Sequence, residues 1–218
     1  MTIKHHVGDD LLLSYGAGTL DEAMSLLVAT HLALCPTCRA DLELAEAVGG
    51  VLIDRTPTDT AVDEAMLEAV LDGACQDDNA GAPALRASNE ALVLPQPLYN
   101  YAGGDADTLR WRSAGGGIRQ VLLKTVGAGT TARLLSIPAR KSVPRHGHRG
   151  VEATLVLAGS FYDRDAWYRR GDVGIASPEV VHRPVAGPEQ DCICLAVTDA
   201  RLEFRTPIPR LLQPFHGI

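Results

Sequence analysis

The pattern of apolar positions divides the chain into two unlike halves. Up to about residue 75, apolar residues recur every three or four positions, which predicts amphipathic helices. Four helices are expected, with Thr19 capping the second and Gly49-Gly50 ending the third: Asp9–Tyr15, Leu20 to about Leu34, Pro36 to about Val48, and about Asp59–Gly73. The first half is therefore expected to be an all-α four-helix bundle.

From about residue 90 the pattern changes to short β-type runs separated by Gly, Pro and Asp turns. Such runs predict an antiparallel sandwich or barrel. They are Ile118–Lys124, Ala132–Ile137, Val151–Leu157, Asp172–Ala176 and Cys192–Val197. A small, polar segment around Pro83 is typical of a linker, at about residues 76–89. The sequence predicts two domains, residues 1–85 and 90–218.

Charge is distributed unevenly between these halves. Residues 1–85 carry 15 acidic and three basic residues, a net charge of −12, whereas the whole chain carries −7. An acidic half is poorly suited to bind phosphates but suited to cover the basic surface of a DNA-binding protein. Solvated helix faces would give the same balance. Without a secretory signal or an apolar run of about 20 residues, the chain is expected to be soluble and cytoplasmic.

A first group of metal ligands lies in the helical half. His31 and Cys35 are one helical turn apart, and Cys38 follows a corner at Pro36, so three ligand types can face one space. The fourth ligand would be His5 or His6. Two Cys and two His favour Zn²⁺, which would contribute directly to folding a small domain. A redox Cys-x-x-Cys is the alternative.

A second group lies in the β half. His146 and His148 flank one residue at a strand end, so both imidazoles point to one side of the strand. Glu152 and His182 complete a set of three His and one carboxylate suited to a barrel interior. Such a set accepts Zn²⁺, Fe²⁺, Mn²⁺ or Ni²⁺. Histidines that only fill a core or lie on a surface are the alternative.

The remaining cysteines give weaker signals. Five cysteines are an odd number, which argues against a complete disulfide framework. Cys192 and Cys194 share one face of a predicted strand, either as core residues or as a candidate redox pair near the second metal group. Cys75, at a helix end, has no evident role.

These motifs resemble two known modules. The His31-x3-Cys35-x2-Cys38 pattern is similar to that of bacterial zinc-binding anti-sigma domains, and the resemblance selects His6 as the upstream ligand. The segment from His146 to Gly159 resembles the first cupin motif, with Ala139 in place of its opening Gly.

The segment from Gly171 to His182 resembles the second cupin motif less closely. Six residues separate Gly171 from Pro178, the step from Pro178 to His182 is one residue short, and the inner Gly is missing. The loop before His182 is therefore expected to differ from the usual cupin loop.

Across its whole length, from the opening Met-Thr-Ile to Gln213-Pro-Phe, the chain resembles the ChrR-type zinc-dependent anti-sigma factors. The resemblance implies a negative regulator of transcription whose N-terminal domain sequesters an extracytoplasmic-function sigma factor in a 1:1 complex. It implies a zinc-binding cupin domain that controls release in response to singlet oxygen, without direct contact with nucleic acid or membrane. The rival interpretation is a dioxygenase-like cupin enzyme with an accessory helical domain, which would need an open metal position.

Overall fold

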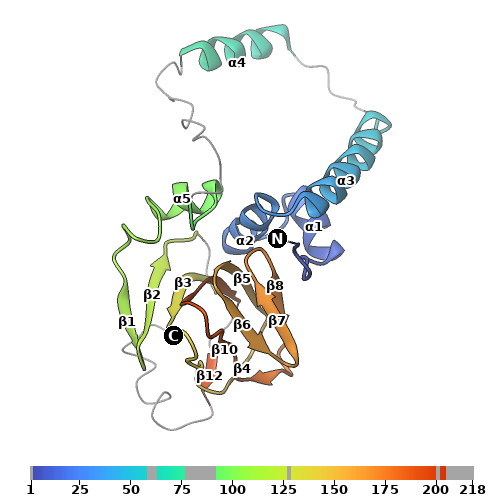
Figure 1. Cartoon of the computed structure of the whole chain (residues 1–218). Helices are drawn as coiled ribbons and strands as arrows, with labels where there is room; N and C mark the ends of the chain where they lie inside the picture. The colour runs from blue at the N-terminus through green and yellow to red at the C-terminus, as the bar shows by residue number, and fades with distance from the viewer. Residues whose placement is uncertain (1, 58–62, 77–91, 127–128, 200–201, 205–218) are drawn as a thin grey trace.

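The computed structural model describes residues 2–57, 63–76, 92–126, 129–199 and 202–204. Five helices lie in these ranges (Figure 1): α1 (Asp9–Gly16), α2 (Glu22–Leu32), α3 (Pro36–Asp54), α4 (Glu64–Gln76) and α5 (Gln96–Ala102). The expected linker at residues 76–89 lies outside the described residues, except for the last residue of α4, and so do residues 213–215. Cys75 lies in α4.

The helix ends differ from the sequence expectation at two places. Asp21, not Thr19, caps α2: its carboxylate accepts from the Met24 N–H at 3.0 Å, while the Thr19 hydroxyl donates to the Ser14 carbonyl. Helix α3 continues through Gly49-Gly50 to Asp54. Glycine lowers helix stability by about 1 kcal/mol but keeps its backbone donor and acceptor, so it does not by itself end a helix.

Helix α5 was not predicted, because the pattern after residue 90 was assigned to strands only. Proline at its first turn and Gly103 in a left-handed conformation after it mark its two ends. Its Leu98 is fully buried.

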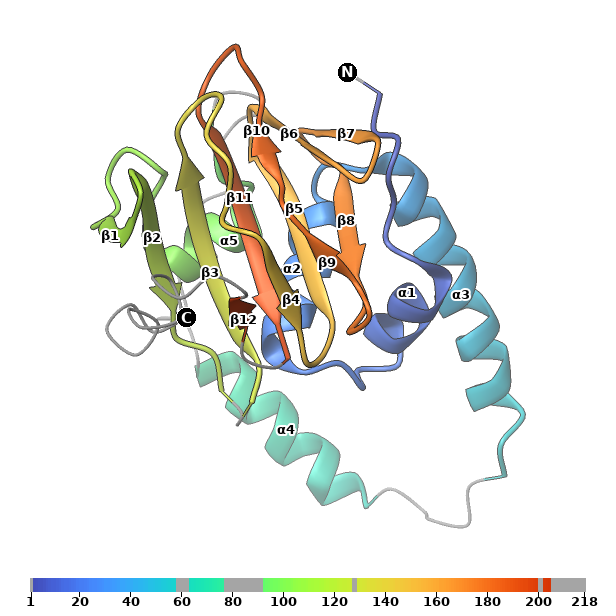
Figure 2. The same cartoon turned by 90° about the horizontal axis from the view of Figure 1, so that it is seen from below.

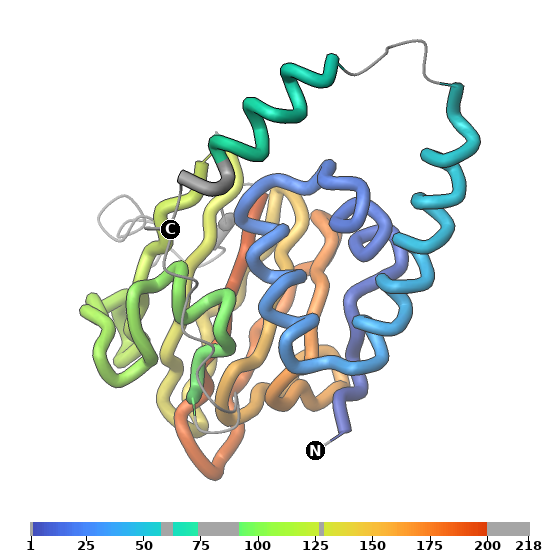
Figure 3. Tube along the Cα trace, turned by 90° about the horizontal axis from the view of Figure 1, so that it is seen from above, coloured from blue at the N-terminus to red at the C-terminus, as the bar shows by residue number. Residues whose placement is uncertain are grey.

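Among the described residues, the expected four-helix bundle is not confirmed. Helices α1, α2 and α3 pack on one another, whereas α4 stands away from them (Figure 1). Helices α2 and α5 instead cover one face of the largest sheet, as Figures 2 and 3 show. Leu27 of α2 belongs to the same hydrophobic core as Leu155 and Leu195 of the sheet. One core therefore joins the helical and β parts.

The described residues of the β part form three antiparallel sheets. The largest has the order β1 (Arg112–Gly115), β2 (Ile118–Leu123), β3 (Thr131–Ile137), β11 (Cys192–Thr198), β5 (Glu152–Ala158) and β8 (Val173–Ala176). The second has the order β10 (Val185–Ala186), β6 (Ser160–Asp163) and β7 (Ala166–Arg169). The third has the order β12 (Leu202–Phe204), β4 (His146–His148) and β9 (Val181–His182).

All five predicted strands are present within one or two residues of their expected bounds. Among the described residues the strand pairing does not close into a ring, so a closed barrel is not confirmed. No single described helix is long and apolar enough to cross a membrane, although the bent pair α2 and α3, at 118°, meets the length and composition criteria together.

Two candidate metal centres

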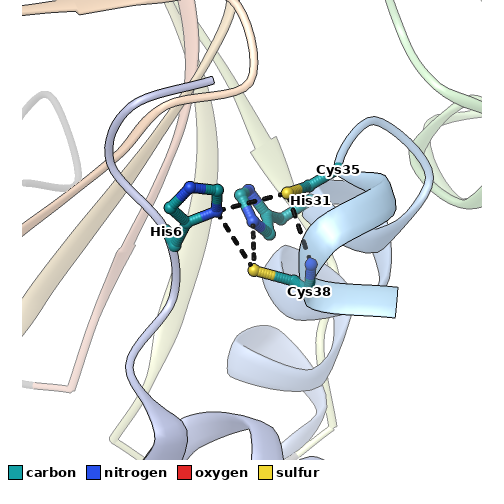
Figure 4. Close-up of side chains that lie close together, drawn as sticks. All are labelled: His6, His31, Cys35 and Cys38. Carbon is teal, nitrogen blue, oxygen red and sulfur yellow. Dashed lines mark hydrogen bonds between the residues drawn. The ribbon is translucent and has the colours of Figure 1, made fainter. Parts of the chain in front are cut away.

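The helical group brings four ligand atoms together around one point (Figure 4). The His6 Nδ1 atom lies 3.3 Å from the Sγ atoms of both Cys35 and Cys38, and the His31 Nε2 atom lies 3.3 Å from the Cys38 Sγ. All four ligand atoms are within 4.8 Å of one another. His5, the other sequence candidate, turns away and places its ring 4.4 Å from the Tyr168 ring.

Local helix geometry produces this cluster. His31 lies in the last turn of α2, and Cys35 is the residue that caps α3, with its Sγ accepting from the Cys38 N–H. Pro36 fits the first turn of α3, where a backbone donor is not needed. The segment before α1 brings His6 to the open side of the corner.

The four ligands fit a tetrahedral zinc ion. Zn–S bonds of about 2.3 Å and Zn–N bonds of about 2.0 Å place N and S ligands about 3.5 Å apart. The observed N···S separations of 3.3 Å are close to that value. Two thiolates and two imidazoles are also the donor set that Zn²⁺ prefers over harder metals.

Burial keeps two members of this group, His31 and Cys38, uncharged without a cation. Burial lowers the pKa of His31 to about 4, which keeps its imidazole neutral. Burial and a hydrogen bond with Cys35 raise the pKa of Cys38 to about 12. A divalent cation would supply the charge that displaces the Cys38 proton.

The second group lies between two sheets of the β part. His146 and His148 come from β4 and His182 from β9, whereas Glu152 comes from β5 of the six-stranded sheet. Strands β4 and β9 pair with His146 opposite His182. The His182 Nε2 atom lies 3.0 Å from the His148 Nε2, 3.1 Å from the His146 Nε2 and 3.4 Å from the nearer Glu152 oxygen.

Two of these histidines are held in the tautomer that a metal requires. The His146 Nδ1 donates to the Pro144 carbonyl at 2.8 Å, and the His182 Nδ1 donates to the Asp163 carboxylate at 2.7 Å. In each ring Nε2 is therefore the atom that faces the centre of the group and would coordinate a metal. The buried His148 Nδ1 has no hydrogen-bond partner among the described residues. Three imidazoles and a carboxylate fit a divalent transition metal.

Charge balance in this group favours ionised Glu152. Burial acts to raise the pKa of Glu152, but hydrogen bonds from His146 and His182 outweigh it and hold that pKa well below its usual range. Burial acts to lower the pKa of His182, but hydrogen bonds to Asp163 and Glu152 raise it to about 9. Burial lowers the pKa of His148. A metal cation would take the place of the Nε2 proton through which His182 contacts Glu152, while the Nδ1 proton would stay on the side of Asp163.

A cavity opens beside the second group, with Leu135, Phe161 and Tyr168 among its apolar lining residues. Cys194 also lines it, whereas Cys192 is buried in the adjoining core. A hydrogen bond between these two thiols, together with burial, raises the pKa of Cys194 well above its usual value. A protonated thiol is weakly reactive, so the redox assignment of this pair stays a prediction.

Asp163 is the residue in this centre that the sequence analysis missed. It is 6% exposed, and its contact with His182 spans 19 positions. Nothing in its local sequence distinguishes it from the neighbouring Asp165, which lies on the surface and accepts from the Tyr162 hydroxyl.

Similarity to known proteins identifies the family. Residues 101–201 match the family described as the ChrR Cupin-like domain. The anti-sigma-E factor ChrR of Cereibacter sphaeroides is 49% identical over 218 residues, which covers 100% of both chains. The chain belongs to the ChrR family of anti-sigma factors.

One solved structure agrees with this ChrR assignment. A chain in the crystal structure of Rhodobacter sphaeroides SigE in complex with the anti-sigma ChrR matches with a TM-score of 0.78 and 46% identity, over 90% of this chain and 99% of that one. An RmlC-like cupin protein from Ralstonia eutropha matches with a TM-score of 0.42 and 21% identity, over 48% of this chain and 71% of that one.

Membership of the ChrR family decides between the two interpretations of the sequence. Its members are regulatory proteins, so this chain is a regulator and not a cupin enzyme. The β part is a cupin-like domain, and the first part is a helical region.

Proposed function

We propose that this chain binds and inhibits an extracytoplasmic-function sigma factor in a 1:1 complex, in the cytoplasm where such factors work. Residues 1–85 would form the binding domain. Residues 90–218 would form a cupin barrel that permits release under a stress signal such as singlet oxygen. The relative solved in complex with SigE supports this assignment.

The observation that carries the proposal is the apolar surface of α3. Five large apolar side chains on this helix are between 55% and 75% exposed: Leu44, Val48, Val51, Leu52 and Ile53. Leu44, Val48 and Leu52 are spaced four residues apart and so form a row on one helix face. A contiguous exposed apolar surface of this kind marks a protein interaction site.

Helix α4 presents a second apolar row. Met66, Leu67, Val70 and Leu71 are between 52% and 67% exposed, and α4 stands apart from the other helices (Figure 1). The acidic residues Glu64, Glu68 and Asp72 lie on the same helix. A partner with apolar grooves and basic surroundings would suit both helices. A partner held between α3 and α4 would cover both apolar rows, which the described residues leave exposed.

Zinc would fix the shape of this binding unit. An ion held by His6, His31, Cys35 and Cys38 would lock the corner between α2 and α3 and so set the direction of α3. The group of His146, His148, Glu152 and His182 would hold Zn²⁺ or another divalent transition metal in the cupin-like domain.

Replacing two residues of the α3 row tests the proposal. The chain would be co-expressed with each extracytoplasmic-function sigma factor of its own genome, and the complex purified and its Kd measured. Val48→Glu with Leu52→Glu keeps helix propensity but removes the burial of two side chains. We expect a loss of at least about 3 kcal/mol, or about 100-fold in Kd.

Leu122→Glu is the matched control, because Leu122 is 58% exposed on β2 and the charge change per site is the same. It should leave the Kd unchanged. Failure of every sigma factor to co-purify, or full affinity of the α3 variant, would refute the proposed function.

A further inference from the structure

The turn between β7 and β8 in the cupin-like domain reaches into the helical metal group. The His31 Nδ1 donates to the Gly171 carbonyl at 2.9 Å, across 140 positions of sequence. His31 is fully buried. Its Nε2, which faces the Cys38 sulfur, therefore has its tautomer and ring orientation fixed by a residue of the cupin-like domain.

The next residue of the same turn holds the segment that carries the other imidazole. The Asp172 carboxylate accepts from the backbone N–H groups of Lys4 at 2.7 Å and His5 at 3.0 Å, and from Arg169 at 2.8 Å. Asp172 is only 2% exposed. The Val173 N–H adds a bond to the His5 carbonyl at 2.9 Å. His6 directly follows this clamped segment.

The close approach of the N-terminal segment to the cupin-like domain depends on Gly171 in this turn. Gly171 has a φ of +90°, and a Cβ added there would lie 2.5 Å from the Ile3 Cδ1. A side chain at this position would be strained by the positive φ and would force the Ile3 side chain to shift.

The turn is also bonded to the strand that carries a ligand of the second metal group. The Gly171 N–H donates to the Val156 carbonyl at 2.8 Å, and the Val156 N–H donates to the Asp172 carbonyl at 3.1 Å. Val156 lies on β5, the strand that begins with Glu152. Beside it, Tyr168 both lines the cavity of the second group and packs against the His5 ring.

We propose that the Gly171–Asp172 turn is the outer shell of the helical metal site, so that the cupin-like domain sets how tightly the helices hold their zinc. The inference rests on the proposed zinc site in the helical region and goes beyond it. Gly171 orients His31 directly, and Asp172 is a positioning residue that acts on His6 through the backbone of residues 4 and 5. Partners of this kind typically change metal affinity by about 10- to 100-fold.

Through this arrangement, a structural change in the cupin-like domain can alter the helices proposed to bind the sigma factor. A displacement of β5 at Glu152 would move the turn that orients His31 and clamps His5. If zinc were bound less tightly at the corner between α2 and α3, the orientation of α3 would no longer be fixed. Because coupling between two sites is reciprocal, zinc binding at the helical site would in turn stabilise the cupin-like domain.

The test measures metal binding at the helical site in the full chain. Cobalt bound by Cys35 and Cys38 gives a thiolate-to-metal charge-transfer band, which the His and Glu ligands of the second group do not give. The variants are Asp172→Ala, which removes all three acceptor contacts, and Asp172→Asn, which keeps one acceptor oxygen. Asp191→Ala is the control. The Asp191 carboxylate also accepts from a backbone N–H, that of Ala139, and its replacement removes the same charge as Asp172→Ala does.

We expect Asp172→Ala to release zinc to a chelator about tenfold faster than the unaltered chain, with Asp172→Asn in between and Asp191→Ala unchanged. The charge-transfer band should weaken in the same order. Folded variants at Asp172 that hold metal as tightly as the control overturn the inference. If Asp172→Ala does not fold, Asp172→Asn decides alone. An unaltered chain without any thiolate-bound metal would instead refute the proposed zinc site.

Discussion

Asp163 offers a direct test of the metal site proposed for the cupin-like domain. Its carboxylate accepts from the His182 Nδ1 at 2.7 Å, and both side chains are 6% exposed. In Asp163→Asn, the amide group can donate to Nδ1 instead of accepting from it. The imidazole proton would then move to Nε2, the atom that faces the other ligands, and would block metal coordination.

The expected loss of metal affinity follows from this single hydrogen bond between Asp163 and His182. A hydrogen bond to a charged, buried group contributes about 1.5–3 kcal/mol. At about 1.4 kcal/mol for each factor of ten, its loss lowers metal affinity by about 10- to 100-fold, which is the range usual for carboxylates behind a ligating histidine. The helical group shares no residue with this contact, so the direct loss of affinity falls on the second group.

The assay is competition with chelators of graded strength, followed by metal analysis of the protein. Asp165→Asn is the control: it removes the same charge from the same hairpin, and Asn tolerates the left-handed backbone found at that position. Asp163→Asn should lose one metal equivalent at a chelator strength where the control keeps both. Equal retention in the two variants would show that Asp163 does not orient His182.

Two further predictions concern the core and the helical site. Leu27→Ala should lower the free energy of unfolding by about 2–5 kcal/mol. Urea denaturation should show the helical part and the cupin-like part losing stability together, because Leu27 lies in the core that they share. An unchanged urea midpoint for the cupin-like part would contradict the shared core. Cys35→Ser should remove the helical metal while α3 keeps a side chain able to cap it; metal analysis that still finds a full complement would rule out Cys35 as a ligand.

The grouping of candidate metal ligands that lie close in sequence could be predicted, because their geometry is local. Helical periodicity predicts that His31 and Cys35 face one side, although Cys35 lies beyond the end of α2 and caps α3. Strand alternation makes the same prediction for His146 and His148 of β4. Glu152 and His182 came from the order of a known motif, and the structure brings both to the second group even though the loop before His182 departs from that motif.

The residues that support these ligands were not predictable. Asp163 and Asp172 are two of 27 acidic residues, and the contacts of Asp172 with the N-terminal segment span 167 and 168 positions. Their roles follow from how the hairpin of β6 and β7 and the turn before β8 are placed in three dimensions. No pattern of spacing carries that information.

The exposed rows on α3 and α4 show a different limit of sequence reasoning. Periodicity correctly indicated that these helices have apolar faces, and the four-helix expectation assumed that the faces cover one another. In the structure, Leu44 and Leu52 of α3 and Val70 of α4 all face solvent. An amphipathic pattern indicates that one helix face is buried. It does not indicate whether the same chain or a partner molecule covers that face. An apolar face left uncovered by its own chain, on an acidic helix, is therefore evidence for a partner rather than a flaw in the assignment of the helix.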